Sequence, residues 1–456
     1  MKPLEFETLR NAVSGTAAAF RLKLQLQPAA GEGTKVFPPT YSGAVYATEQ
    51  RRIEGHDDPV ECVLLDSVQS QANRMEEALQ LAIDNGQLKI PLIEVDFTPF
   101  FPVPGETDEL SEGMRLIDEV GTISALQAPH RIADAILRDS QIDGQRFRDT
   151  EVGQQINRVS ARNATALFKL CPTALLFGMW DSTGPKGGLG AKFERAIVSE
   201  IVGINAVYGV KTSSRIDPLG IQKNAGPLYR RPEGGWTTNP DEALDELKKG
   251  KPTGKKILFK QNSKGQDVAH LPGDEKFPDQ GRPSEANHSN ITPSLSEIDP
   301  KTKEYLAGGV TIESAQQTVV ISLPALRRLR FPLDGKTGKD AVQANDAART
   351  VLAALGLCAA TLAIETGYDL RSRCLLWPDE KPVWQLLDRP GEEPQEFTLD
   401  GKSAIELLNK AVAAAKEAGL TWNTEPLSLR PSDDLVQLVV KSQQLAAGSG
   451  SNGEDS

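Results

Sequence analysis

The chain has 456 residues, of which 39% are hydrophobic and 25% charged, a balance that fits a folded globular protein and excludes wholesale disorder. Its formal net charge of −11 excludes a protein that coats nucleic acid with a uniformly basic surface. It does not exclude a local basic patch. The first ten residues lack the features of a signal peptide, and no later run approaches the ~18 apolar residues needed to span a bilayer. We therefore expect a cytoplasmic protein with no membrane partner.

Four cysteines lie far apart among apolar neighbours and form no CxxC pair: Cys62, Cys171, Cys358 and Cys374. This spacing favours buried reduced thiols over a disulfide framework or a zinc site.

Taken from the N-terminus, residues 20–27 alternate apolar and polar, which predicts a strand with one wet, partly basic face. Apolar residues then recur at gaps of three and four from Leu65 to Leu79, which predicts a long helix. Residues 91–97 are typical of a further strand. The order of these elements favours an α+β fold with helices on one face of a sheet.

In the middle of the chain we expect a helix at 164–170, a Gly-rich turn at 184–190, a helix carrying Phe193, Ile197 and Ile201, and a strand at 206–212. Between residues 232 and 300, 15 of 69 residues are Gly or Pro, which indicates an insertion rather than core.

The last part predicts a strand at 317–323, a helix at about 339–366, short strands at 373–377 and 383–387, and a helix at 403–418. Residues 446–456 are rich in Gly, Ser and acids, which predicts a disordered tail.

Basic residues gather in two stretches despite the acidic total. Residues 158–231 carry 11 Lys or Arg against 4 Asp or Glu, and a lysine run spans residues 248–264. Such a run is often only a solvated surface, but two neighbouring basic stretches make a phosphate-tracking surface more plausible.

Three short segments combine hydrogen-bonding side chains with cations. The first predicted helix carries a polar flank. The interpretation that needs no ligand is an exposed face on which Arg74 pairs with Glu77. The turn at 184–190 opens the predicted helix and suits a phosphate, although it lacks the hydroxyl of a Walker loop. Residues 211–215 place three hydroxyls between two cations, which suits sugar and phosphate oxygens or simple loop capping. The candidate residues are Gln69, Ser70, Asn73, Arg74, Lys186, Lys192, Arg195, Lys211, Ser213, Ser214 and Arg215.

Catalytic signals are sparse. The histidines at 56, 130, 270 and 288 have no Cys or second His at ligand spacing, and no Gly-x-Ser-x-Gly is present. The sequence thus predicts neither a metal site nor a cofactor.

Several long strings nevertheless occur in a specific order over most of residues 35–335. They include ECVLLDSVQSQANRMEEAL (61–79), ARNATALFKLCPTALLFGMWDSTGPKGGLGAKFERAIVSEIVG (161–203), KTSSRIDPLGI (211–221), GRPSEANHSNITPS (281–294) and TVVISLPALRRLRF (318–331). In these strings the chain resembles the backbone subunit of the type I-G (formerly I-U) CRISPR Cascade complex, within the RAMP superfamily.

The resemblance implies an RRM-like (ferredoxin-like) palm with finger, web and thumb insertions. The palm would occupy 1–231 and 310–445, with a thumb-like or flexible insertion at 232–309 and a tail at 446–456. It also implies a non-enzymatic protein whose partners are guide RNA, target DNA through the guide, head-to-tail copies of itself, the large Cascade subunit and the guide-processing RAMP subunit.

We expect the candidate residues above, together with His288, to contact the RNA backbone with little sequence preference. The polar face of the strand at 20–27 has no aromatic side chain, so base stacking there is not expected. One alternative is a RAMP endoribonuclease using Asp181 or His288. Another is a nucleotide hydrolase using the turn at 184–190, which the missing hydroxyl disfavours.

Overall fold

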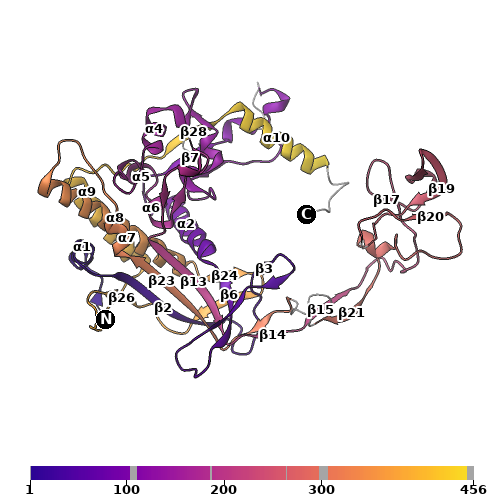
Figure 1. The fold of residues 1–456 in the computed structure, drawn as a ribbon, viewed down its shortest axis with the longest axis horizontal. Helices are drawn as coiled ribbons and strands as arrows, with labels where there is room; N and C mark the ends of the chain where they lie inside the picture. The colour runs from indigo at the N-terminus through magenta and orange to yellow at the C-terminus, as the bar shows by residue number, and fades with distance from the viewer. Residues whose placement is uncertain (1, 103–109, 185–186, 263, 297–306, 449–456) are drawn as a thin grey trace. The chain divides into compact units, whose positions relative to one another are not determined.

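The structure is a computed structural model that describes residues 2–102, 110–184, 187–262, 264–296 and 307–448 (Figure 1). The chain divides into two compact units. Unit 1 comprises Met1–Gly209 and Gly309–Lys441, and unit 2 comprises Val210–Gly308 with Ser442–Ser456. Unit 2 thus includes the Gly/Pro-rich insertion but begins ahead of residue 232.

Unit 1 is built on a large sheet whose main path runs β1-β27-β26-β2-β23-β13-β6-β5, with β24 and β25 attached beside β2. Its strands are β1 (Lys2–Pro3), β2 (Ala19–Pro28), β5 (Thr48–Arg51), β6 (Val60–Asp66), β13 (Ile197–Ile204), β23 (Ser314–Ser322), β24 (Tyr368–Arg371), β25 (Cys374–Pro378), β26 (Trp384–Leu387) and β27 (Gln395–Thr398).

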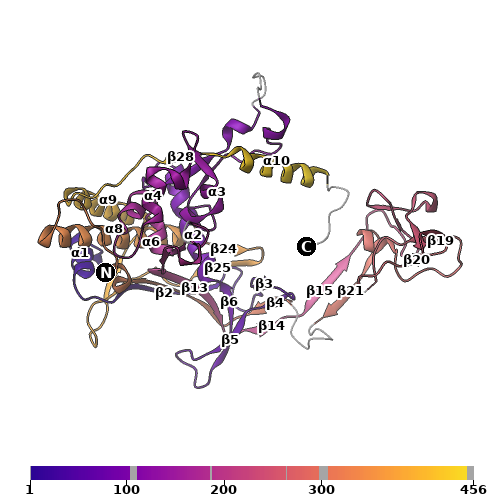
Figure 2. The ribbon, with the colours of Figure 1, turned by 45° about the horizontal axis from the view of Figure 1, so that its top comes forward.

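Helices cover one face of this sheet (Figures 1 and 2). They are α1 (Phe6–Ser14), α2 (Val68–Asp84), α7 (Leu323–Arg327), α8 (Gly338–Glu365) and α9 (Gly401–Glu417). The predicted α+β class is confirmed.

The centre of the sheet is a βαββαβ series that strands β5, β6, β24 and β25 of the same sheet interrupt along the chain. Without them and the other elements outside the sheet, the series is β2, α2, β13, β23, α8, β26. In space the four strands lie in the order β26-β2-β23-β13. Because β23 is antiparallel to both of its neighbours, and β2 is antiparallel to β26, each helix connects two strands that run in the same direction with one strand between them. The two crossover helices therefore pack side by side on the same face.

Strand β2 confirms the alternation predicted for residues 20–27. Phe20, Leu22 and Leu26 have no exposed surface, whereas Lys23 and Gln25 are exposed. Burial of each leucine side chain stabilises the fold by about 1.5–3 kcal/mol. The opposite face of β2 is left with polar side chains.

Helix α8 is long and apolar enough to span a membrane by length and composition, so the expectation that no segment approaches this limit is wrong. However, 78% of its apolar window is buried inside the protein. Its composition is explained by its place in the core, where α1, α2 and α9 pack against it.

A second sheet in unit 1 has the order β10-β9-β28-β7-β8. Its strands are β7 (Ile93–Asp96), β8 (Thr122–Ser124), β9 (Ser140–Ile142), β10 (Gln145–Arg146) and β28 (Leu427–Pro431). Unit 1 also has short helices: α3 (Ala135–Arg138), α4 (Glu151–Asn157), α5 (Thr165–Leu170) and α6 (Thr173–Phe177). Pairs of short strands lie outside the two sheets: β3 (Thr40–Tyr41) with β4 (Val45–Tyr46), β11 (Met179–Trp180) with β12 (Lys192–Phe193), and β14 (Val207–Tyr208) with β22 (Val310–Thr311).

Two local predictions are wrong. The helix expected to carry Phe193, Ile197 and Ile201 is divided between β12, which holds Phe193, and β13, whose β-branched residues fill the sheet between β6 and β23. The strand expected at 206–212 is divided between β14 and β15 (Lys211–Arg215), which pair with different strands.

Of the tail predicted at 446–456, residues 446–448 belong to α10 (Asp433–Gly448), and the remainder lies outside the described residues.

Unit 2 consists mainly of short antiparallel strands. They are β15 paired with β21 (Ile291–Ser296), β16 (Tyr229–Arg230) with β17 (Trp236–Thr237), and a sheet of β18 (Asp245–Lys248), β19 (Lys251–Ile257) and β20 (Ala269–His270). Tyr229, Ala243 and Leu258 form a small buried core, against which Val268 packs.

Candidate nucleic-acid interface

The polar flank of α2 is organised around Asp66, whose side chain is fully buried at the end of β6. Ser67 caps the helix by accepting a hydrogen bond from the backbone N–H of Ser70. The Ser70 hydroxyl donates to Asp66 Oδ1 at 2.8 Å, and Arg74 Nε donates to Asp66 Oδ2 at 2.9 Å. Two of the candidate RNA-binding side chains are therefore turned towards a buried carboxylate.

This network extends from α2 into the sheet. Arg74 Nη2 donates to the carbonyl of Leu370 at 2.7 Å. The side-chain oxygen of Gln71 accepts hydrogen bonds from Ser199 and Gln317, both at 2.8 Å. The alternative in which Arg74 pairs with Glu77 on an exposed face is wrong. Arg74 instead links α2 to β24. Gln69 and Asn73 remain exposed on the helix.

The turn at 184–190 does not open a helix. It connects β11 to β12, and the strands pair through Met179 with Phe193 and through Trp180 with Lys192. The argument that a helix N-terminus holds a phosphate at this turn is therefore wrong. Lys186 lies outside the described residues.

Asp181 forms the base of this turn. Its backbone N–H donates to the carbonyl of Ala191 at 2.9 Å, and its buried carboxylate binds Arg148 Nη2 at 2.9 Å. A Cβ atom at Gly190 would lie 1.8 Å from the Asp181 carbonyl oxygen, so only glycine fits there. Asp181 has a structural role that fully accounts for its position.

Trp180 and Lys192 form an exposed pair on the β11–β12 hairpin. The Lys192 ammonium lies 5.7 Å from the centroid of the Trp180 ring, and Trp180 is 54% exposed. Arg195 is also exposed, two residues beyond β12. Neither Lys192 nor Arg195 forms an ion pair within the part of the chain that the structure describes. An exposed ring beside a cation such as Lys192 can stack on a base and attract a phosphate.

The sequence did not single out Trp180 as an exposed side chain, because it ends an apolar run, which favours burial. The only available signal was its position immediately before a Gly-rich turn.

In unit 2, the candidate segment 211–215 forms strand β15. Lys211, Ser213 and Ser214 are exposed. Arg215 instead points back to its own unit, where Nη2 donates to the carbonyls of His288 and Ser289 at 2.6 and 2.9 Å. The His288 ring packs edge-on against Trp236, with ring centroids 5.7 Å apart.

Groups suited to catalysis do not cluster in the described ranges. No set of three or more His, Cys, Asp or Glu residues there could hold a metal ion. All four cysteines are free and buried, as predicted. Burial raises the pKa of the Cys358 thiol to about 12, which keeps it protonated at neutral pH.

Comparison with known families adds one observation. Residues 20–208 match the family model of CRISPR-associated protein GSU0053. The match supports a CRISPR-associated protein. It includes α2 and the β11–β12 hairpin. No curated protein matches the chain.

Proposed function

We propose that this protein is a backbone subunit of a type I-G Cascade complex. It binds guide RNA along the sugar–phosphate backbone, lines up in copies along that RNA, and presents it for pairing with target DNA. Its partners are further copies of itself, the large subunit and the guide-processing RAMP subunit, in the prokaryotic cytoplasm. The protein itself performs no cleavage.

The observation that carries this proposal is the exposed Trp180–Lys192 pair, which lies within the segment that matches the CRISPR-associated family. Base–aromatic stacking and phosphate attraction both act on any RNA sequence, because every base has a π face and every nucleotide a phosphate. Sequence-independent contacts are what a subunit that must accept any guide requires.

The fold supports the same proposal. The βαββαβ centre of the sheet has the connectivity expected of an RRM-like palm. Its uncovered face offers Lys23, Gln25 and Arg21, and the Arg21 Nε donates to the side chain of Gln385 at 3.0 Å. This face suits backbone contacts better than base stacking. Lys211, Ser213 and Ser214 on β15 offer a second set of exposed donors.

The experiment compares Trp180→Ala and Lys192→Ala with Lys410→Ala, which removes an exposed lysine from α9. We expect Trp180→Ala to weaken binding of every single-stranded RNA by roughly ten-fold or more. Lys192→Ala should weaken all RNAs alike and lower the dependence of affinity on salt. Lys410→Ala should bind as the wild type does. Equal affinities for all three variants, with unchanged melting temperatures, would contradict the proposal.

A further inference from the structure

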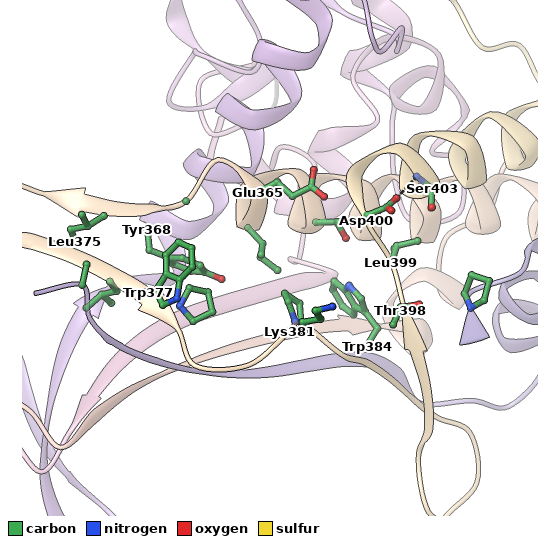
Figure 3. Close-up of a pocket in the computed structure, with 18 residues that line it drawn as sticks. Glu365, Tyr368, Leu375, Trp377, Lys381, Trp384, Thr398, Leu399, Asp400 and Ser403 are labelled. Carbon is green, nitrogen blue, oxygen red and sulfur yellow. Dashed lines mark hydrogen bonds between the residues drawn. The ribbon is translucent and has the colours of Figure 1, made fainter. Parts of the chain in front are cut away.

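A mostly apolar pocket of about 850 Å³ opens in unit 1 between the C-terminal end of α8, the first residues of α9 and strands β25 to β27 (Figure 3). Aromatic, proline and aliphatic side chains line it, among them Tyr368, Trp377, Pro382, Trp384 and Leu399. This volume and lining are typical of a site that accepts a side chain or a short peptide segment. We call it the α8–α9 pocket.

Acidic side chains outnumber the lysine, Lys381, in and beside the lining of the pocket. Asp379 and Glu380 are exposed in the loop between the lining residues Pro378 and Lys381, and neither forms an ion pair among the described residues. Glu365 and Asp400 line the pocket as well. The exposed apolar side chains of Leu375 and Trp377 flank this loop. The chemistry therefore fits an apolar group that is surrounded by cations.

The tip of the β18–β19 hairpin, residues 247–252, is such a group. Lys249 and Gly250 both have positive φ angles, which is the geometry of a tight two-residue turn. Lys248 pairs with Lys251 directly beside the turn, and Leu247 pairs with Pro252 one position further from it. Leu247 is 61% exposed. The lysines at 248, 249 and 251 are exposed and form no ion pair among the residues described. We call this segment the hairpin tip.

We propose that the hairpin tip of one copy docks into the α8–α9 pocket of a second copy. Leu247 and Pro252 enter the apolar pocket, and the lysines face Asp379 and Glu380. Tip and pocket are different surfaces, so the contact is head to tail and can repeat from one copy to the next. The inference rests on the proposed function, for which it supplies the contact between neighbouring copies.

The alternative binding partner of the lysines at the hairpin tip is RNA. The exposed Leu247–Pro252 pair favours the protein partner, because phosphate binding gives no reason for two apolar side chains at the tip. Lysine side chains can also lay their apolar stems along Leu375 and Trp377 while the ammonium groups reach the acids.

Charge reversal tests the contact. A tip variant carries Lys248→Glu and Lys249→Glu, and a pocket variant carries Asp379→Lys and Glu380→Lys, all at exposed positions. Assembly on a long RNA is followed by sedimentation velocity. We expect each variant alone to assemble roughly ten-fold less well or worse, because like charges replace attractive ones. An equal mixture of both variants should assemble again, since each tip then meets a pocket of opposite charge.

Two further readouts make every outcome decisive. Each variant should bind the shortest RNA that holds one copy as tightly as the wild type does. Loss of this binding in the tip variant alone would assign the lysines to RNA and overturn the proposal. Wild-type assembly by either variant, or no recovery in the mixture, would also overturn it, the latter because a contact within one chain is not restored by mixing.

Cross-linking separates this proposal from the proposed function. A bifunctional maleimide should join Lys248→Cys in one tagged copy to Glu380→Cys in another, while the four native cysteines are buried. A cross-link between copies that bind no RNA would support the contact and contradict the proposed function. RNA binding without a cross-link would support the proposed function and contradict the contact.

Discussion

The guanidinium of Arg74 binds the fully buried carboxylate of Asp66, with 2.9 Å between Arg74 Nε and Asp66 Oδ2. Arg371 approaches the same carboxylate at 3.3 Å from another strand. Two cations from distant parts of the chain thus meet one buried acid. The pair fixes α2 against the sheet.

Removing Asp66 should therefore destabilise the fold. We expect Asp66→Ala to lower the free energy of unfolding by about 3–5 kcal/mol, since it leaves partly buried cations without their counter-charge. Urea denaturation followed by tryptophan fluorescence measures this change. Glu77→Ala, at an exposed position on the same helix, should stay within about 0.5 kcal/mol of the wild type. If both variants unfolded at the same urea concentration, the network would have no structural role.

The turn at 184–190 offers a matched pair of glycines. Gly190→Ala should cost about 1–3 kcal/mol, because its Cβ would overlap the Asp181 carbonyl oxygen and force the turn to shift. Gly188→Ala should be tolerated, because nothing lies within 4 Å of a Cβ atom there. Thermal unfolding of the two variants checks the difference. A melting temperature lowered by Gly188→Ala as much as by Gly190→Ala would contradict the geometry of the turn.

The spacing of apolar residues in the sequence predicted the sheet and its helices well. Strand β2 and helices α8 and α9 each show the same pattern of apolar residues from one end of the element to the other. The prediction failed at Phe193, Ile197 and Ile201, whose spacing of four also fits a helix. Phe193 lies in β12, and only the flanking strands β6 and β23 show that Ile197 and Ile201 belong to a buried strand.

The candidate site was predicted less well, because residue type does not reveal where a side chain points. Arg74 and Arg215 were expected to face RNA, but they bind Asp66 and the carbonyls near His288. Lys192 and Lys211 are exposed. The sequence around Asp66 gives no sign that its carboxylate attracts Arg74, because the two lie eight residues apart and on different elements.

We expect no cleavage by the isolated protein. Incubation with labelled guide RNA and its complement in magnesium should give protection without new fragments. Asp181 is held by Arg148, and the His288 ring packs against Trp236. The carboxylate near His288, that of Asp217, already accepts hydrogen bonds from the backbone N–H groups of Leu219 and Ser289. Specific cuts abolished by Asp181→Asn or His288→Ala would establish a ribonuclease instead, and turnover of ATP would establish a nucleotide hydrolase.

The most direct test of the central claim is filter binding of unrelated single-stranded RNAs of equal length over a series of salt concentrations. Contacts to the sugar–phosphate backbone predict affinities within about three-fold of one another and a steep linear fall of log K with log salt concentration. Affinities that vary strongly with sequence, or that barely change with salt, would contradict the account.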